Sequence, residues 1–355
     1  MRSLVLTDHF KCGGAERVAS LLINGLSTDE DNEVHVCVFE DTNRYGVDKG
    51  RVFYHLLVKK NRIGIIDNLS KIWNLTKVMR KVNPEIIYSF GPIMASYVII
   101  AAWLSGIRRR VRIVSSERND PRREPVSDWK KIARDKAYNA SDVVVCQTPM
   151  ALELLKKRGI KSKFVIIPNP ISPNLPKWHG EESKDIITAA RLTEQKNLPL
   201  LISAFGRVYK EYPDYRLIIY GEGELMGELH NLIDSRNLND VVLMPGFANN
   251  ISEIMAGAYM YVSSSDYEGI SNSMLEALAI GLPCVCTDCP VGGAAMYIKN
   301  NVSGLLTRVM DEEGLYSAMK RLIIDKDLAI SISKESRKAL KDLTVDNITK
   351  RWVEL

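Results

Sequence analysis

The sequence predicts an α/β protein with two mostly parallel β-sheets, each covered by helices. Short apolar runs alternate with helix-like segments along nearly the whole chain, and connections of this kind join parallel strands. A proline-rich segment near the middle interrupts the alternation. At 355 residues, of which 46% are hydrophobic, the chain is long enough for two domains with sizeable cores.

The first half is expected to begin with a strand and to alternate regularly from there. Its expected strands cover residues 3–7, 33–39, 85–89, 111–115, 143–146 and 165–167. Its expected helices cover residues 15–26, 65–82, 93–104, 126–139 and 149–158. We therefore assign residues 1–168 to a first domain.

Prolines at 168, 170, 173 and 176 then break every periodic pattern. We place an interdomain linker at residues 169–183 and a second domain at residues 184–340. Strands of this domain are expected at residues 185–190, 216–220, 241–244, 259–263 and 284–287. Residues 311–355 are expected to be helical throughout, and 341–355 form the C-terminal helical segment.

Several classes of protein are not expected. Met1 leads directly into the first strand, so we expect no signal peptide. The longest apolar run, residues 93–104, is too short to span a bilayer and is expected to form a buried helix. Cys284 and Cys286 alternate on a strand with Cys289 nearby and no evident fourth ligand, so we expect reduced thiols in a cytoplasmic protein.

The net charge of +5 hides an uneven distribution. Residues 1–175 contain 29 Lys and Arg against 18 Asp and Glu, a net charge of +11, whereas residues 176–355 carry −6. The cations of the first half gather in clusters: Lys59, Lys60, Arg62, Arg80, Lys81, Arg108, Arg109, Arg110, Arg112, Arg118, Arg122, Arg123, Lys130 and Lys131. About half would be solvated loop charge, but the excess indicates an anionic partner such as a membrane surface. No nucleic-acid-binding motif accompanies them, so nucleic acid is not expected.

Two glutamates eight positions apart give the strongest functional signal. Glu268 lies in the polar turn after the strand 259–263, and Glu276 lies inside the next helix, for which Asn272 is the expected N-cap. Open α/β sheets bind ligands at the carboxyl ends of their strands. Glu268 can bond hydroxyl groups there, and Glu276 can hold a diol. In isolation, both could equally be ordinary charges on an amphipathic helix.

The other unusual loops of the second half also follow strands. In chain order they contain Arg191 and Lys196, Gly221 and Gly223, Phe247, and the segment 288–294. Because the carboxyl ends of parallel strands meet at one edge of a sheet, we expect these loops to cluster there. Without such neighbours, Arg191 and Lys196 would be interpreted as a surface pair beside a helix start.

This ordered set of loops resembles the nucleotide-sugar domain of the retaining glycosyltransferases of family 4, of the bacterial surface-polysaccharide type. The segment 12–18, Cys-Gly-Gly-Ala-Glu-Arg-Val, is similar to the family's opening loop. The resemblance covers nearly the whole chain. It implies the GT-B architecture, in which two Rossmann-like parallel-sheet domains face a central cleft and the final helix crosses back to the first domain.

The chemistry of such a transfer can be reasoned from the residues. A departing nucleotide diphosphate develops negative charge, so its site needs cations, dipoles or a metal. Arg191 and Lys196 supply cations, and the amides of Gly13 and Gly14 at the start of the first helix supply dipoles. The aspartate pairs at 29/31 and 325/327 lie in acidic turns away from strand ends. We therefore expect no metal site. No cofactor is expected either, because the nucleotide sugar is a substrate.

The resemblance implies specific roles on the donor side. Glu276 would hold the ribose hydroxyls, and Glu268 would grip the donor sugar together with the amides of Gly269, Ile270 and Ser271.

Other donor-side roles follow from the same resemblance. Gly221 and Gly223 would let the backbone approach the nucleotide, and the backbone near Phe247 would read the base. The family transfers with retention through same-face attack assisted by the departing phosphate, so no protein nucleophile is required.

The acceptor side departs from the family pattern. The family often has a histidine in a first-domain loop that faces the acceptor, whereas the corresponding loop here contains Glu117, Arg118 and Asn119. His9, in the first glycine loop, is a possible substitute, although a lone loop histidine is more often a surface residue.

Three functions remain open from the sequence. The leading one is a hexosyltransferase that uses a nucleotide sugar, such as a UDP-sugar, to extend a lipid-linked or cell-surface glycan at the inner face of the plasma membrane. The second is a soluble synthase of a small glycoside. The third is a catalytically inactive subunit that binds nucleotide or glycan. The basic first half favours the first over the second, and the full set of charged and glycine loops argues against the third.

Overall fold

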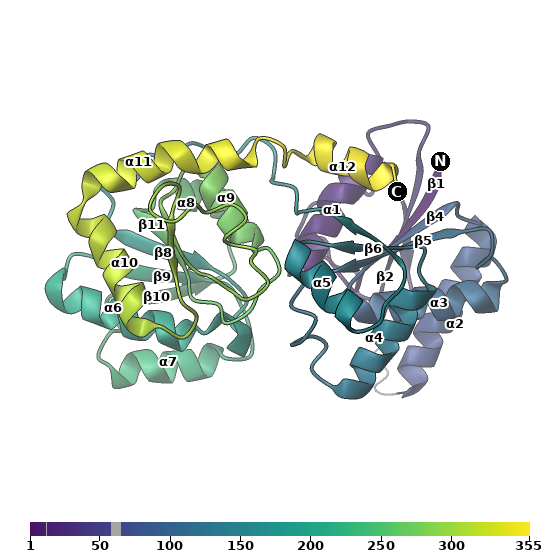
Figure 1. Ribbon diagram of the computed structural model, residues 1–355, viewed down its shortest axis with the longest axis horizontal. Helices are drawn as coiled ribbons and strands as arrows, with labels where there is room; N and C mark the ends of the chain where they lie inside the picture. The colour runs from purple at the N-terminus through teal and green to yellow at the C-terminus, as the bar shows by residue number, and fades with distance from the viewer. Residues whose placement is uncertain (12, 58–64) are drawn as a thin grey trace. The chain divides into compact units, whose positions relative to one another are not determined.

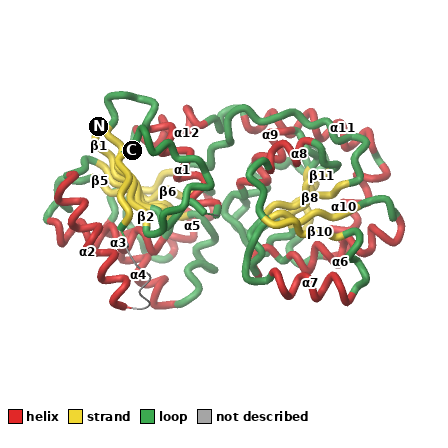
Figure 2. The backbone as a smooth tube through the Cα atoms, turned by 180° about the vertical axis from the view of Figure 1, so that it is seen from behind, coloured by secondary structure: helices red, strands yellow, loops and turns green. Residues whose placement is uncertain are grey.

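The computed structural model describes residues 1–11, 13–57 and 65–355 (Figure 1). They form two compact units, one consisting of Met1–Pro170 with Val345–Leu355 and the other of Ile171–Thr344. Each unit holds a parallel sheet between layers of helices (Figure 2). The predicted pair of Rossmann-like parallel-sheet domains is therefore confirmed. The predicted basic residues Lys59, Lys60 and Arg62 and the opening-loop residue Cys12 lie outside the described residues.

The described sheet of the first unit has the strand order β3-β2-β1-β4-β5-β6-β7, and all neighbouring strands are parallel. The strands are β1 (Arg2–Leu6), β2 (Glu33–Val38), β3 (Phe53–Leu56), β4 (Ile86–Phe90), β5 (Arg112–Glu117), β6 (Val143–Cys146) and β7 (Lys163–Ile166). The helices are α1 (Gly14–Leu26), α2 (Ile65–Val82), α3 (Pro92–Ser105), α4 (Asp128–Ala140), α5 (Pro149–Lys157) and α12 (Val345–Val353).

Alternating strand residues divide the core of the first unit between the two faces of its sheet. Leu4 and Leu6 of β1 share one buried cluster with apolar residues of α2, α3, α4 and α5. On α12, the ring of Trp352 is buried against Tyr88 and Phe90, with centroid distances of 5.7 and 5.4 Å. The C-terminal helix is therefore an integral part of the first unit's packing.

The second unit repeats this plan with the parallel strand order β10-β9-β8-β11-β12-β13. Its strands are β8 (Asp185–Ala189), β9 (Arg216–Tyr220), β10 (Val242–Gly246), β11 (Met260–Ser263), β12 (Cys284–Thr287) and β13 (Leu305–Thr307). Its helices are α6 (Leu198–Glu211), α7 (Met226–Ser235), α8 (Ile251–Ala256), α9 (Asn272–Ile280), α10 (Glu312–Ile324) and α11 (Lys326–Ser336), with 3₁₀ turns η1 (Glu194–Lys196) and η2 (Arg337–Leu340).

Each sheet has a topological switch point beside its first strand. In the first unit the chain passes from β1 to β2 and β3 and then crosses to β4 on the other side of β1. In the second unit it passes from β8 to β9 and β10 and then crosses to β11. Loops that leave the two strands at a switch point diverge, and the crevice outside their carboxyl ends is where α/β sheets bind ligands.

Three expectations about elements are wrong. The short edge strands β3 and β13 were not predicted, because the exposed side chains of Phe53 and Leu56 and the three-residue length of β13 give little periodic signal. Residues 311–355 are not helical throughout, since Asp325 leaves helical geometry and caps α11, and residues 341–344 are irregular. The helix α3 is not fully buried, because Ile100, Trp103 and Leu104 are exposed.

Candidate active site

The loops after β8 and β11 meet at the switch point of the second sheet and hold Glu268 between them. The Lys196 ammonium contacts Glu268 Oε1, and Gln195 Nε2 donates a hydrogen bond to Glu268 Oε2 at 3.3 Å. Ser265 Oγ donates to Glu268 Oε1 at 3.3 Å. Lys196 and Glu268, both singled out from the sequence, are thus brought into contact although they are 72 positions apart in the chain.

Further hydrogen bonds fix these two loops to each other. Asp266 N donates to Gln195 O at 2.9 Å, and Ser264 Oγ donates to Lys196 O at 2.8 Å. Asn197 Nδ2 donates to Asp266 Oδ1 at 2.8 Å. Gln195 was not predicted as a site residue, although its place beside Lys196 in the loop after β8 was a usable signal.

Glu276 lies in a different environment from Glu268. It is one turn inside α9, its exposed fraction is 3%, and Ser172 Oγ donates to its Oε1 at 2.8 Å. The helix begins one residue earlier than expected, because Ser271 is the N-cap and its Oγ accepts from Met274 N at 3.4 Å. The prediction of Asn272 as N-cap is therefore wrong. Ser172 was also missed, since nothing in the proline-rich linker indicates a contact with α9.

The two glycines after β9 are required by the packing of neighbouring loops. A Cβ atom on Gly221, whose φ is +141°, would lie 1.8 Å from Ala190 O. A Cβ on Gly223 would lie 2.3 Å from Leu192 O, and Leu192 N donates to Glu222 O at 3.0 Å. These glycines therefore let the loop after β9 pack against the loop after β8. This contact alone explains why glycine is needed at both positions.

The remaining donor-side residues lie around the same edge of the sheet. Arg191 is exposed directly after β8, and Phe247 is half-buried directly after β10. Gly269, Ile270 and Ser271 lead into the N-terminus of α9. A Cβ on the glycine at 293 would lie 1.8 Å from the carbonyl oxygen of Gly269, so the loop after β12 also reaches this edge.

In the first unit, the start of α1 is a glycine turn covered by a carboxylate. Gly13 has a φ of +117° and precedes Gly14, the first residue of α1. A Cβ on Gly13 would lie 2.1 Å from Glu16 Oε2, so the Glu16 carboxylate sits at the N-terminus of this helix. His9 lies earlier in the same loop, and its Nδ1 accepts from Lys11 N at 3.3 Å.

Glu117 ends β5 as a fully buried carboxyl group. Its Oε1 accepts from the amides of Arg118 and Asn119 at 3.0 and 3.3 Å, and Oε2 lies 3.8 Å from Arg134 Nη1. Burial raises the pKa of Glu117 to about 7, against the opposing effects of Arg134 and the two amides. Its carboxyl group therefore titrates near neutral pH.

Arg118 extends across the same end of the first sheet. Its guanidinium donates to Ser116 Oγ at 3.3 Å and to Asn169 Oδ1, and it lies 5.6 Å from the centroid of the Phe90 ring. Burial lowers the pKa of Arg118 to about 10, although the carboxylates of Glu16 and Glu117 oppose that shift. The loops after β1 and β5 are therefore coupled electrostatically, and Arg118 keeps its charge at neutral pH.

Within the described part of the chain, no group of three or more His, Cys, Asp or Glu side chains is arranged to hold a metal ion. Cys284, Cys286 and Cys289 are buried free thiols, and burial raises the pKa of Cys289 to about 12. Of the helices that the structure describes, none combines the length and apolar character needed to cross a bilayer.

Two family models match the two halves of the chain. Residues 12–175 match the family model "Glycosyltransferase Family 4", and residues 176–339 match "Glycosyl transferases group 1". An N-acetylgalactosaminyltransferase of Campylobacter jejuni, which by its name acts on a diphospho-undecaprenol substrate, is 28% identical over 346 residues, covering 93% of this chain and 92% of that one. An Escherichia coli α-1,3-galactosyltransferase named for UDP-Gal and a diphosphoundecaprenol acceptor is 27% identical over 333 residues, covering 86% and 82%.

Solved structures share the fold. Anabaena HepE in complex with UDP and glucose superposes with a TM-score of 0.87 at 19% identity, covering 100% of this chain and 98% of that one. Staphylococcus aureus TarM, in a complex that contains UDP, has a TM-score of 0.83 at 14% identity and 99% coverage of both chains.

Two α/β units with loops gathered at their switch points define a GT-B glycosyltransferase fold. The chain belongs to the glycosyltransferases of the family 4 and group 1 type.

Proposed function

We propose that this glycosyltransferase moves a hexose or N-acetylhexosamine from a UDP-sugar to a lipid-linked or cell-surface glycan acceptor, with retention of the anomeric configuration. One observation carries the donor side of the proposal: Lys196 and Glu268 are in contact at the carboxyl edge of the second sheet, at its switch point. A cation that can bind the diphosphate and a carboxylate that can bind sugar hydroxyls therefore lie next to each other.

The proposed mechanism needs no covalent intermediate with the protein. Arg191 and Lys196 stabilise the negative charge that develops on the departing diphosphate, while Glu268 positions the sugar ring. The departing phosphate oxygen accepts the proton of the attacking hydroxyl on the same face of the sugar. Glu276, oriented by Ser172, holds the ribose, and no metal is required.

Support for the acceptor class comes from two sources. The C. jejuni and E. coli relatives are both named for undecaprenol-linked substrates. The first half of this chain carries a net charge of +11, which suits an acceptor presented on an anionic membrane at the inner face of the plasma membrane.

A donor panel tests the proposal. The protein is incubated with single nucleotide sugars, with and without a polyprenyl-diphosphate-linked sugar, and the released nucleotide and glycan are identified by mass spectrometry. We expect UDP release from one or a few UDP-sugars and transfer to the lipid-linked acceptor, with an unchanged anomeric configuration by NMR. Full-rate transfer to a small water-soluble acceptor would instead indicate a soluble synthase, and no turnover of any donor would indicate a binding subunit.

A further inference from the structure

Three tryptophans are exposed on neighbouring helices of the first unit. The chain has five, and Trp178 and Trp352 are buried. The other three are Trp73 on α2, Trp103 on α3 and Trp129 on α4, with exposed fractions of 53%, 60% and 67%. Helix α3 packs against both α2 and α4 on one flank of the unit (Figure 1). Large aromatic side chains exposed on three adjacent helices make an apolar surface whose exposure needs an explanation.

Exposed aliphatic side chains lie on the same three helices as these tryptophans. They are exposed on the sides of the three helices that face away from the sheet, and on the turn before α4: Ile66, Leu69, Ile93, Ile100, Leu104, Val126 and Ile132. The opposite sides of the same helices supply the core of the unit, for example through Leu75, Val98 and Tyr138. Each helix is therefore apolar on its core side and partly apolar on its outer side, which is unusual for a helix exposed only to water.

Cations are interleaved with this apolar surface. Lys77 Nζ lies 5.6 Å from the centroid of the Trp73 ring, and Lys130 Nζ lies 5.6 Å from that of Trp129. Two of the three tryptophans thus have an ammonium group beside the indole, as in side-chain sets that occupy the boundary between lipid headgroups and hydrocarbon.

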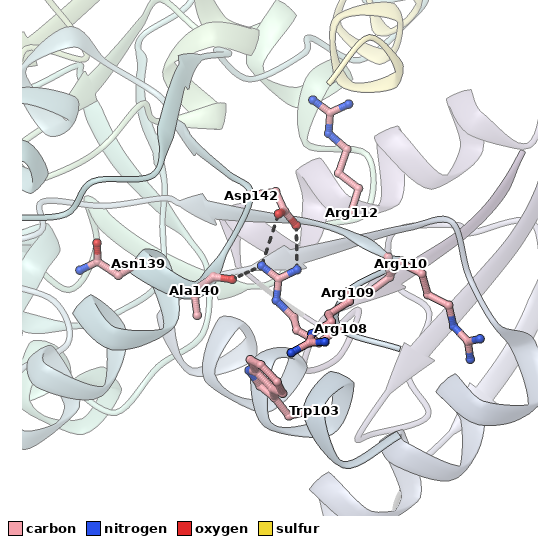
Figure 3. Close-up of a pocket in the computed structure, with 9 residues that line it drawn as sticks. Trp103, Arg108, Arg109, Arg110, Arg112, Asn139, Ala140 and Asp142 are labelled. Carbon is pink, nitrogen blue, oxygen red and sulfur yellow. Dashed lines mark hydrogen bonds and ion pairs between the residues drawn. The ribbon is translucent and has the colours of Figure 1, made fainter. Parts of the chain in front are cut away.

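The loop between α3 and β5 adds arginines next to Trp103 (Figure 3). Arg108 is not free, because it bonds both Asp142 oxygens at 3.2 and 3.3 Å and the Ala140 carbonyl. In the sequence Arg108 belongs to the same basic cluster as its neighbours, but in the structure its charge is already paired with Asp142. Arg109, Arg110 and Arg112 pair with no carboxylate of the described residues, and with Trp103 they line an open hollow of about 920 Å³.

The arrangement of these groups indicates the kind of partner. Figure 3 shows the Arg110 and Arg112 guanidinium groups extending in different directions, with Arg112 pointing away from Trp103. The charge of Arg112 acts on Tyr88, which packs against Trp352 of α12, so Arg112 lies on the other face of the sheet and the cations do not converge on one anion. Diverging cations suit many anionic charges spread over a surface. A second copy of this chain would bring like charges together, which is unfavourable. Tryptophan with lysine and arginine on adjacent helices is the combination that binds at the interface of an anionic bilayer.

We propose that the outer face of α2, α3 and α4, with the 108–112 loop, is the surface that docks this enzyme on a bilayer containing anionic lipid. Trp73, Trp103 and Trp129 enter the headgroup region, and Arg109 and Arg110 contact lipid phosphates. The proposal rests on the proposed function in one respect, because it supplies the surface on which a lipid-linked acceptor is presented. Arg112 begins β5 and Glu117 ends it, so the arginine loop and the predicted acceptor-side residues lie at opposite ends of one strand.

Vesicle binding by the full chain tests this surface. We expect co-sedimentation with vesicles of phosphatidylcholine and phosphatidylglycerol, a blue shift of tryptophan emission on binding, and little binding to phosphatidylcholine alone. Binding should fall as salt is added. The variant Arg109→Gln/Arg110→Gln should bind anionic vesicles at least about tenfold more weakly, since each lost cation weakens the attraction several-fold. Trp103→Ser should weaken binding and reduce the blue shift.

A matched control separates the surface from net charge. The variant Lys210→Gln/Arg236→Gln removes the same charge from exposed positions of the second unit and should bind like the wild type. Equal loss in both double variants, equal binding to neutral vesicles, or no binding to anionic vesicles would overturn the proposal. So would a dimer in light scattering that Trp103→Ser dissociates, because the face would then be a contact between copies.

Hydrolysis of the nucleotide sugar without vesicles provides an independent readout. The arginine variant should hydrolyse donor at the wild-type rate, and its melting temperature should be unchanged. If the chain binds anionic vesicles but turns over no donor, the docking surface stands and the proposed function fails. If it turns over donor but ignores anionic vesicles, the docking surface fails and the function stands.

Discussion

Glu268 and Glu276 lie eight positions apart, but the structure gives them different surroundings. Glu268 is partly exposed and is held by Lys196, Gln195 and Ser265. Glu276 is buried and receives a hydrogen bond from Ser172 at 2.8 Å. A carboxylate that is fixed and largely desolvated suits a diol that is always held in the same place, whereas one beside a cation suits a group whose charge changes during reaction.

Substitutions of the two glutamates should therefore have different effects on UDP binding and on turnover of the UDP-sugar. We expect Glu276→Gln to weaken the binding of free UDP about tenfold or more, since a charge-assisted hydrogen bond contributes roughly 1.5–3 kcal/mol. Glu268→Gln should leave UDP binding within about threefold but lower turnover of the UDP-sugar by more than tenfold. Calorimetry and initial rates decide this, with Glu253→Gln as an exposed control on α8. The reverse pattern would show that the two roles are exchanged.

At this scale, the sequence identified charged residues better than their partners. Glu268, Arg191 and Lys196 were singled out because charged residues after strands are conspicuous, and Glu276 because of its spacing from Glu268. Ser172 and Gln195 were not, because a hydrogen bond between residues 104 positions apart, such as that of Ser172 with Glu276, leaves no local pattern.

At the scale of elements, a buried arginine on α4 organises the loop that follows β5. Arg134 has no exposed surface, and its Nη1 donates to the carbonyl oxygens of Pro121 and Glu124 at 2.7 and 2.8 Å. It also pairs with Asp135 and approaches Glu117. The predicted acceptor-side residues Glu117, Arg118 and Asn119 are thus held by α4 as well as by their own strand.

Glu117 should make stability depend on pH. Its folded-state pKa of about 7 exceeds the ordinary value of 4.5, so the native state binds more protons than the unfolded state between these values. Stability from this group is therefore full below about pH 4.5 and is lost as pH rises to about 7. We expect the melting temperature of Glu117→Gln minus that of the wild type to rise from pH 5 to pH 8, because only the wild type loses this contribution.

The matched control is Glu30→Gln, an exposed carboxylate of the same unit. Its melting temperature should follow that of the wild type across this range. A difference between Glu117→Gln and wild type that stays constant with pH would show that Glu117 has an ordinary pKa.

Most long elements were predicted within one or two residues, because their apolar periods are strong. The helix α2 and the strands β6, β9 and β12 have the expected bounds. The misses have physical causes: β3 is a short edge strand with half-exposed side chains, and the outer side of α3 carries exposed apolar residues that do not pack in the core. An apolar period alone does not distinguish a helix buried on all sides from one that has a second apolar surface.

At the scale of the whole chain, the last helix completes the first unit. Tyr88 OH donates to the carbonyl oxygen of Trp352 at 3.2 Å, and a Cβ on the glycine at 25 of α1 would lie 2.3 Å from Thr349 Oγ1. The local sequence pattern indicated only a C-terminal helical segment, and its return to the first domain was implied by the family resemblance alone, since the contact joins Tyr88 to a residue 264 positions away.

Removing the Trp352 ring should destabilise the first unit. We expect Trp352→Ala to cost about 3–5 kcal/mol, because the ring is fully buried and leaves a cavity beside Tyr88 and Phe90. Hydrogen exchange should show faster exchange in β1, β4 and α1, with little change in the second unit. Val353→Ala, exposed on the same helix, is the control. Unchanged exchange in the first unit would contradict this packing.

The central claim is that cations of the second unit, in place of a metal, stabilise the departing diphosphate. The most direct test is the rate of UDP release from the preferred UDP-sugar in excess EDTA, for wild type, Arg191→Ala and Lys196→Ala, with Lys210→Ala as a control. We expect wild type and control to keep most of their activity, while each site variant loses about 100-fold or more with its fold intact. Wild-type rates in both site variants, or loss of activity in EDTA that Mn²⁺ or Mg²⁺ restores, would contradict it.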